Sequence, residues 1–243
     1  MERIREPELM EDPLQVKAYA EADFTSTDQA FTLRILELLA SPPPGRALPA
    51  ACGGPGILDL GCGPGNISFR LAAALPQASV VGLDGAAAML ARAECQRQQE
   101  PGRWHHLRFQ LARLSHSPQD LAPLDALPAP FRPPYGVIVS NSLLHHLHDP
   151  AVLWQTVRHL AAPRALVVVR DLRRPPNPEA LHSLMERHAA TAPPVLRRDY
   201  AHSLAAAFRP EEVEAQLEAA GLSSLRVASL DDRYLEVSGR LPA

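Results

Sequence analysis

The chain has 243 residues, of which 46 % are hydrophobic and 21 % charged, so it can bury a sizeable core and disorder is not expected. Its formal net charge of −3 disfavours a polyanionic partner such as nucleic acid. The three cysteines lack disulfide or metal-ligand spacing, and neither a signal peptide nor a membrane-length apolar run is recognisable. We therefore predict a cytoplasmic protein without a membrane partner.

The first predicted element is a helix over residues 13–40, which a loop rich in proline and glycine (41–56) brings to an end. Strands and helices then alternate. Strands are predicted at 57–60, 79–84, 106–112, 136–141 and 165–172, and helices at 66–75, 85–99 and 150–161. Such alternation indicates an α/β fold with a doubly wound, mostly parallel sheet.

The C-terminal part follows a different pattern. Residues 177–208 have helical spacing with a break at 192–194, residues 210–221 form a helix, and the runs 225–230 and 234–239 form a hairpin. The hairpin brings the expected number of strands to seven. We expect one domain over 1–243, made of an N-terminal helical lid (1–50), a core (51–175), a helical insertion (176–208) and a C-terminal helix and hairpin (209–243).

A glycine-rich turn follows the first strand in "ILDLGCGPGN" (57–66). Gly61, Gly63 and Gly65 occupy alternate positions, and Asp59 lies inside the strand. Dinucleotide-binding proteins carry G-x-G-x-x-G instead, so this spacing argues against a nicotinamide dehydrogenase. The string resembles motif I of the class I S-adenosylmethionine (SAM) methyltransferases, and the resemblance covers about residues 55–175.

The resemblance implies a Rossmann-like methyltransferase fold with SAM as cofactor and S-adenosylhomocysteine (SAH) as product. Asp84 ends the next strand 19 residues after Gly65, where the family holds the acidic ligand of the ribose hydroxyls. The family's acidic residue beside the adenine is replaced here by Ala112 and Arg113. The cofactor site is expected to comprise Asp59, Gly61, Cys62, Gly63, Gly65, Asp84, Gly85, Met89, Leu111, Ala112, Asn141 and Ser142.

Polar residues crowd the ends of the fourth and fifth strands, where ligands bind in doubly wound sheets. The stretch "VSNSLLHHLHDP" (139–150) resembles a signature of small-molecule methyltransferases. We predict His145 and Asp171 as a catalytic pair, with His145 as general base; the alternative is that the histidines only pack and cap the following helix. No metal site is expected, because neighbouring histidines point different ways and no carboxylate has convincing ligand spacing.

The acceptor is expected to be a small molecule, methylated at oxygen or nitrogen, under the N-terminal lid and the insertion. Arginines there could bind a carboxylate or phosphate, or could simply be solvated helix ends. The candidate acceptor-binding residues are Tyr19, Phe24, Arg173, Arg174, Arg197 and Tyr200. The rival functions are methylation of a transfer-RNA base and SAM binding without catalysis. The expected assembly is a monomer or a homodimer.

Overall fold

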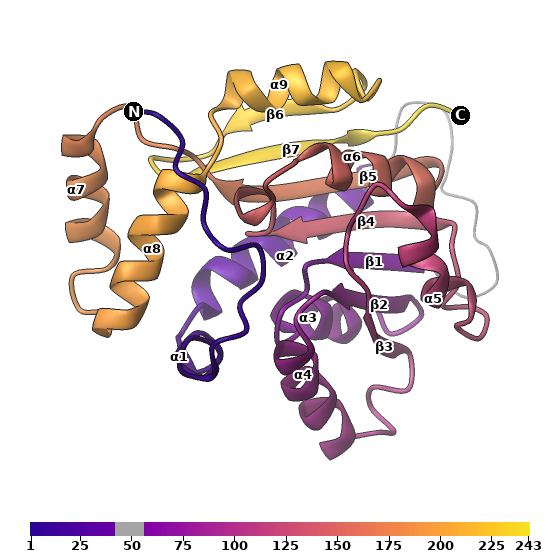
Figure 1. The fold of residues 1–243 in the computed structure, drawn as a ribbon. Helices are drawn as coiled ribbons and strands as arrows, with labels where there is room; N and C mark the ends of the chain where they lie inside the picture. Colours follow the sequence, from indigo (N-terminus) through magenta and orange to yellow (C-terminus); the bar gives the residue numbers. More distant parts are fainter. Residues whose placement is uncertain (42–55) are drawn as a thin grey trace.

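The computed structural model describes residues 1–41 and 56–243 (Figure 1). The loop predicted at 41–56 therefore lies almost entirely outside the described residues. The strands form one sheet in the order β3-β2-β1-β4-β5-β7-β6. Strands β1 to β5 are parallel, whereas β7 runs antiparallel to both β5 and β6. The predicted seven-stranded, mostly parallel sheet is confirmed.

The strands are β1 Gly56–Leu60, β2 Ser79–Asp84, β3 Leu107–Leu111, β4 Tyr135–Asn141, β5 Ala161–Leu172, β6 Arg226–Ser229 and β7 Tyr234–Arg240. The α-helices are α1 Pro13–Glu21, α2 Thr25–Ala40, α3 Asn66–Ala74, α4 Ala87–Gln99, α5 Ala122–Asp125, α6 Ala151–Leu160, α7 Pro178–His188, α8 Pro194–Ala206 and α9 Pro210–Ala219. Two short 3-10 helices, η1 Pro118–Leu121 and η2 Leu144–His146, complete the described elements.

The single helix predicted over 13–40 is wrong, since the segment forms two helices, α1 and α2. The chain leaves the helical conformation at Ala22, whose φ and ψ are −71° and 143°. The carboxylate of Asp23 then accepts a hydrogen bond from the backbone N–H of Thr25 at 2.9 Å, at the first residue of α2. Such a local side-chain bond satisfies a donor that a continuous helix would otherwise pair.

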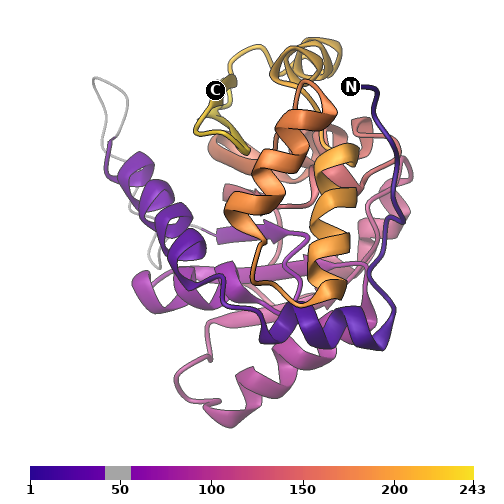
Figure 2. The same ribbon diagram turned by 90° about the vertical axis from the view of Figure 1, so that its left-hand side faces the viewer.

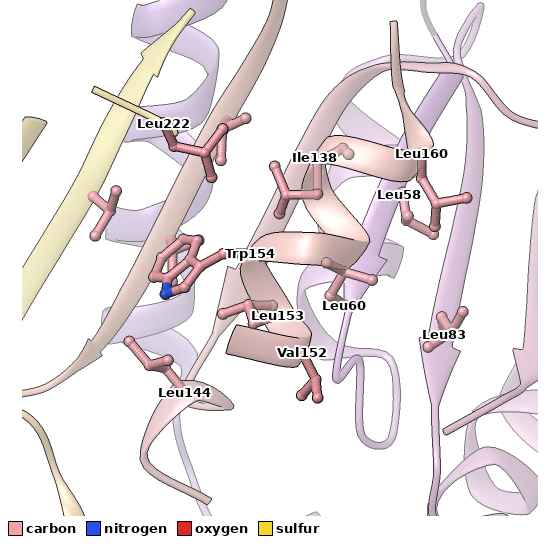
Figure 3. Close-up of a cluster of buried hydrophobic side chains, with 14 of the residues drawn as sticks. Leu58, Leu60, Leu83, Ile138, Leu144, Val152, Leu153, Trp154, Leu160 and Leu222 are labelled. Atoms are coloured by element: carbon pink, nitrogen blue, oxygen red, sulfur yellow. The ribbon is translucent and has the colours of Figure 1, made fainter. Parts of the chain in front are cut away.

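Alternation along the strands produces two apolar layers, one on each face of the sheet. On one face, Phe31 and Ile35 of α2 pack against the sheet together with side chains of α3. On the other, α6 supplies Leu153 and Trp154, and α5 and α9 contribute to the same cluster. Figure 3 shows Trp154 among the leucines of this second layer. The buried sheet therefore fixes the strand ends at which the site is built.

Helices α1 and α8 lie beyond the carboxyl ends of the parallel strands, and the two helices are in contact (Figures 1 and 2). Residues 1–12, which we call the N-terminal strap, cross the same edge. The Arg3 guanidinium fastens the strap by donating to the carbonyls of Ala206, His145 and Leu147 at 2.6, 3.0 and 2.9 Å. None of the helices in the described residues has the length and apolarity needed to cross a bilayer.

We expect Trp154→Ala to lower the free energy of unfolding by ~3–5 kcal/mol, because it leaves a cavity beneath the sheet. Its indole is fully buried and donates to the Gln216 side chain at 3.0 Å. Urea titration measures the change. Leu33→Ala removes a side chain that is 52 % exposed and should cost less than ~0.5 kcal/mol. Equal losses for the two variants would contradict this assignment of the core.

Candidate functional site

The glycine turn after β1 brings the backbone to the rim of a cavity. Gly61 and Gly63 have φ values of +69° and +54°, which residues other than glycine rarely adopt. A Cβ on Gly61 would lie 2.7 Å from the Cδ1 of Leu143, whereas a Cβ on Gly63 would meet no atom within 4 Å. Gly61 is therefore required by packing, and Gly63 leaves space beside its backbone for a ligand.

Asp84, at the end of β2, holds this turn in place. Its Oδ2 accepts from the Gly63 N–H at 2.8 Å, and its Oδ1 accepts from the Ala86 N–H at 2.7 Å. Burial raises the pKa of Asp84, although the two backbone hydrogen bonds act in the opposite direction. Each oxygen keeps a further lone pair, and the side chain lines the cavity. The carboxylate can thus accept both hydroxyls of a ribose.

Asp59 lies deeper in the same wall and is 1 % exposed. Its Oδ2 accepts from the Ser68 hydroxyl of α3 at 2.6 Å, so the carboxylate joins β1 to the helix after the turn. Burial raises the pKa of Asp59 to about 7. A positively charged ligand group in the cavity would stabilise its ionised form.

The cavity has a volume of about 1380 Å³, above the ~300–1,000 Å³ of a pocket for one drug-sized ligand. It therefore has room for a cofactor and a second molecule. Two of the predicted cofactor residues do not line it: Gly65 packs against Phe109 and Phe69, and Leu111 is 50 % exposed. The predicted cofactor residues that do line it are Asp59, Gly61, Cys62, Gly63, Asp84, Gly85, Met89, Ala112, Asn141 and Ser142.

Three of the predicted acceptor residues, Tyr19, Phe24 and Tyr200, line the same cavity. Three predicted arginines are engaged outside it. Arg173 donates to the Asp231 carbonyl at the surface, Arg174 is paired with Glu212, and Arg197 is paired with Glu186. Their neighbours in the fold occupy their guanidinium groups, so we do not include them in the site.

Other polar residues on the acceptor side were missed by sequence reasoning. Arg170 of β5 is 5 % exposed and donates to the Asn141 side chain at 2.8 Å and to the Thr27 carbonyl at 2.7 Å. An arginine within the apolar run "VVVRDL" was the signal that could have revealed it. Arg233 and Tyr234, in and after the hairpin turn, also line the cavity.

The structure brings His145 and Asp171 together. The His145 Nδ1 lies 2.5 Å from the Asp171 Oδ1, and both side chains are buried. The Nε2 of His145 faces the strap, where the Glu6 Oε1 lies 3.6 Å away. The same Glu6 oxygen is 3.0 Å from the Nδ1 of His146. Sequence reasoning missed Glu6, because nothing near it in the chain resembles a site.

We expect Asp59→Asn to stabilise the ligand-free protein at pH 8 but not at pH 4. The folded pKa of about 7 lies above the ordinary value near 4, so the native state resists ionisation. The penalty is small at pH 4, grows as pH rises from about 4 to 7, and levels off above pH 7 at no more than ~4 kcal/mol. Urea titration at both pH values measures it.

Asp125→Asn is the control, since it removes an exposed carboxylate. Its effect should be small at both pH values. If Asp59→Asn lowers stability equally at pH 4 and pH 8, the wild-type carboxylate ionises without penalty.

A family model described as a methyltransferase domain matches residues 58–167. The trans-aconitate 2-methyltransferase of Methylobacterium radiotolerans is 36 % identical over 137 residues, covering 56 % of this chain and 44 % of that protein. The enzyme of the same name from Methylobacterium nodulans is 34 % identical over 187 residues, covering 75 % and 56 %. The chain thus spans about half the length of these relatives.

Solved structures share the fold at low identity. A SAM-dependent methyltransferase from Aquifex aeolicus superposes with a TM-score of 0.61 at 17 % identity, covering 96 % of this chain and all of that one. The plantazolicin methyltransferase BpumL, solved with SAH and a substrate analogue, gives 0.63 at 14 % identity, covering 96 % and 92 %. Residues 58–167 thus correspond to a methyltransferase domain, and the chain as a whole has the fold of SAM-dependent methyltransferases.

Proposed function

We propose that this chain transfers a methyl group from SAM to an oxygen atom of a small molecule that carries a carboxylate. The observation that supports this most directly is one continuous cavity, which is lined by the glycine turn and Asp84 as well as by Tyr200 and Arg233. Such a cavity can hold the methyl donor and the acceptor side by side, and alignment is the main requirement of an in-line transfer.

The cofactor end of the cavity suits the donor. Bound SAM supplies a methyl group that its sulfonium already activates for displacement. The chain's part is to bind and orient it: Asp84 accepts the ribose hydroxyls, and the open side of Gly63 lets the backbone approach. The carboxylate of Asp59 either accepts the ammonium group of the methionine moiety or orients the turn that binds it.

The acceptor end suits an anion. Tyr200 Oη and Arg233 Nε are buried and make no hydrogen bond of good geometry within the described residues, although the two side chains are near enough to interact with each other. Burial raises the pKa of Tyr200 to about 12, so its hydroxyl stays protonated and can donate. Buried donors without partners are costly, and the oxygens of a carboxylate would satisfy both. The names of the relatives cite trans-aconitate, itself a carboxylate, which supports this acceptor class.

A carboxylate acceptor also removes the need for a base, because its oxygen is already ionised at neutral pH. The general-base role predicted for His145 would apply only to a hydroxyl acceptor. It would also require a free Nε2, and that atom faces Glu6. On this proposal, the His145–Asp171 pair shapes the acceptor end of the cavity rather than moving a proton.

The cover over the cavity favours a small molecule over a transfer-RNA base. Residues of α1 and α8 line its outer wall, and the strap crosses beside them (Figure 2). A base flipped out of a nucleic acid would have to enter with its backbone phosphates. The formal net charge of −3 gives those phosphates no general attraction. The second rival function, SAM binding without catalysis, predicts no turnover with any acceptor.

We expect Asp84→Asn to weaken SAH binding by ~1–3 kcal/mol, about 5–150-fold, because a charged acceptor of the ribose hydroxyls is lost. Isothermal titration calorimetry measures this directly. Asp149→Asn, at the exposed start of α6, is the matched control and should leave the affinity unchanged. An unchanged dissociation constant in folded Asp84→Asn would show that this carboxylate does not bind the ribose.

We expect Arg233→Met to raise KM for an acidic acceptor, probed with trans-aconitate and simpler di- and tricarboxylates, by about 10–150-fold, and Tyr200→Phe by about 2–10-fold. SAH affinity should stay unchanged in both variants. Arg173→Met, which removes a surface guanidinium from the same region, should behave as wild type. If SAH binds but no carboxylate is methylated, the acceptor class is wrong while the cofactor assignment stands.

A further inference from the structure

We infer that Glu6, His145 and His146 form a binding site for a divalent transition-metal ion of the zinc type. The inference does not depend on the proposed function, since the ligands are defined without reference to SAM or an acceptor. No metal site was predicted from the sequence, because no carboxylate lies at ligand spacing from the histidines along the chain. The fold supplies that carboxylate from the N-terminal strap, which is far from the histidines in the sequence.

The spacing of the ligand atoms fits a metal ion. Zinc–ligand bonds of ~2.0–2.1 Å in a tetrahedron place neighbouring ligand atoms about 3.3–3.4 Å apart. The Glu6 Oε1 lies 3.6 Å from the Nε2 of His145 and 3.0 Å from the Nδ1 of His146. The three ligand atoms all lie within 4.8 Å of one another. The two distances to Glu6 thus lie within a few tenths of an ångström of the tetrahedral spacing, and rotation of the His146 side chain would adjust the distance between the two nitrogens.

Asp171 provides the outer support that metal-binding histidines usually have. Because the Nδ1 of His145 donates to the Asp171 carboxylate, the neutral ring carries its lone pair on Nε2, toward Glu6. Asp171 is itself held by the backbone N–H groups of Leu144 and Leu172, each at 2.7 Å. On the other side, the Ser203 hydroxyl donates to the Glu6 carboxylate at 3.2 Å. Both ligands are thus oriented before an ion arrives.

The site brings two carboxylates and the imidazole nitrogens close together. A lone pair on Nε2 and the Glu6 carboxylate face each other at 3.6 Å, with no proton of the neutral ring between them. Two buried or nearly buried carboxylates, Glu6 and Asp171, surround the imidazoles, and the nearby Arg3 guanidinium donates to backbone carbonyls and not to either carboxylate. An ion of charge +2 would compensate both facing groups, which are largely removed from solvent, with side chains 3 % and 10 % exposed.

The ligand types select the class of ion. Two imidazoles and one carboxylate suit zinc and its neighbours, whereas magnesium and calcium prefer oxygen ligands throughout. Both histidines also line the cavity, so a water molecule or an oxygen atom from a bound acid can take the fourth position. An ion here would fasten the strap to η2, and it would add a positive charge to the wall of the cavity.

Cobalt(II) titration of the untagged full-length chain, stripped with chelator and free of SAM, tests the site. We expect one Co²⁺ per chain, with the intense visible absorption of four- or five-coordinate cobalt, and displacement by Zn²⁺. Glu6→Gln and His146→Ala each remove a ligand and should weaken binding by at least ~100-fold. Asp171→Asn, which changes only the support, should weaken it by about 10–100-fold.

His116→Ala is the matched control, because this exposed histidine also faces a carboxylate, Asp149, at 2.9 Å. It should bind Co²⁺ like the wild type. Thermal unfolding of each stripped variant confirms that it is folded, and Zn²⁺ should raise the melting temperature of the wild type but not of Glu6→Gln. Failure of the wild type to bind Co²⁺, or equal binding by folded Glu6→Gln, would overturn the inference and leave a metal-free Glu6–histidine ion pair.

Discussion

The hydrogen bonds of the buried Asp171 carboxylate hold together the wall of the cavity around His145. The Asp171 carboxylate is 1 % exposed and accepts from three donors: the N–H groups of Leu144 and Leu172 and the Nδ1 of His145. It thereby ties the end of β5 to the short helix that follows β4. Removing it would leave buried donors without a partner, a far larger cost than losing one surface ion pair. The position of His145, and through it that of the strap, follows from this carboxylate.

Three aspartates near the carboxyl ends of the parallel strands β1, β2 and β5 make different contacts because their surroundings differ. Asp59 is enclosed and bonded to Ser68, so its ionisation is resisted until a cation approaches. Asp84 accepts two backbone N–H groups and keeps free lone pairs toward the cavity. Asp171 accepts hydrogen bonds only from groups inside the fold, namely His145 and two backbone N–H groups. Sheet topology gathers the three at one edge, while local hydrogen bonds decide which of them faces a ligand.

The cavity is closed by segments that are far apart in the chain. The strap brings Glu6 and Arg3 to the histidines, α1 brings Tyr19, and α8 brings Tyr200 opposite Arg233 from the hairpin turn. These segments bring the buried donors of Tyr200 and Arg233 and the cluster of Glu6, His145 and His146 to the same cavity. All of these segments lie outside residues 58–167, which match the methyltransferase-domain model.

The amino-acid sequence alone determined the alternation of strands and helices, the glycine turn and the acidic residue after β2. These features are local: apolar periodicity and glycine spacing report the conformation of the residues that carry them. It also indicated His145 and Asp171, since parallel strands end at one edge of a sheet. Only the tertiary structure decided that Arg174 pairs with Glu212 while Arg170 and Arg233 line the cavity, and that Glu6 reaches His145 and His146. Such contacts join residues more than a hundred positions apart or depend on which face of an element a side chain occupies, and no spacing within a single chain segment encodes them.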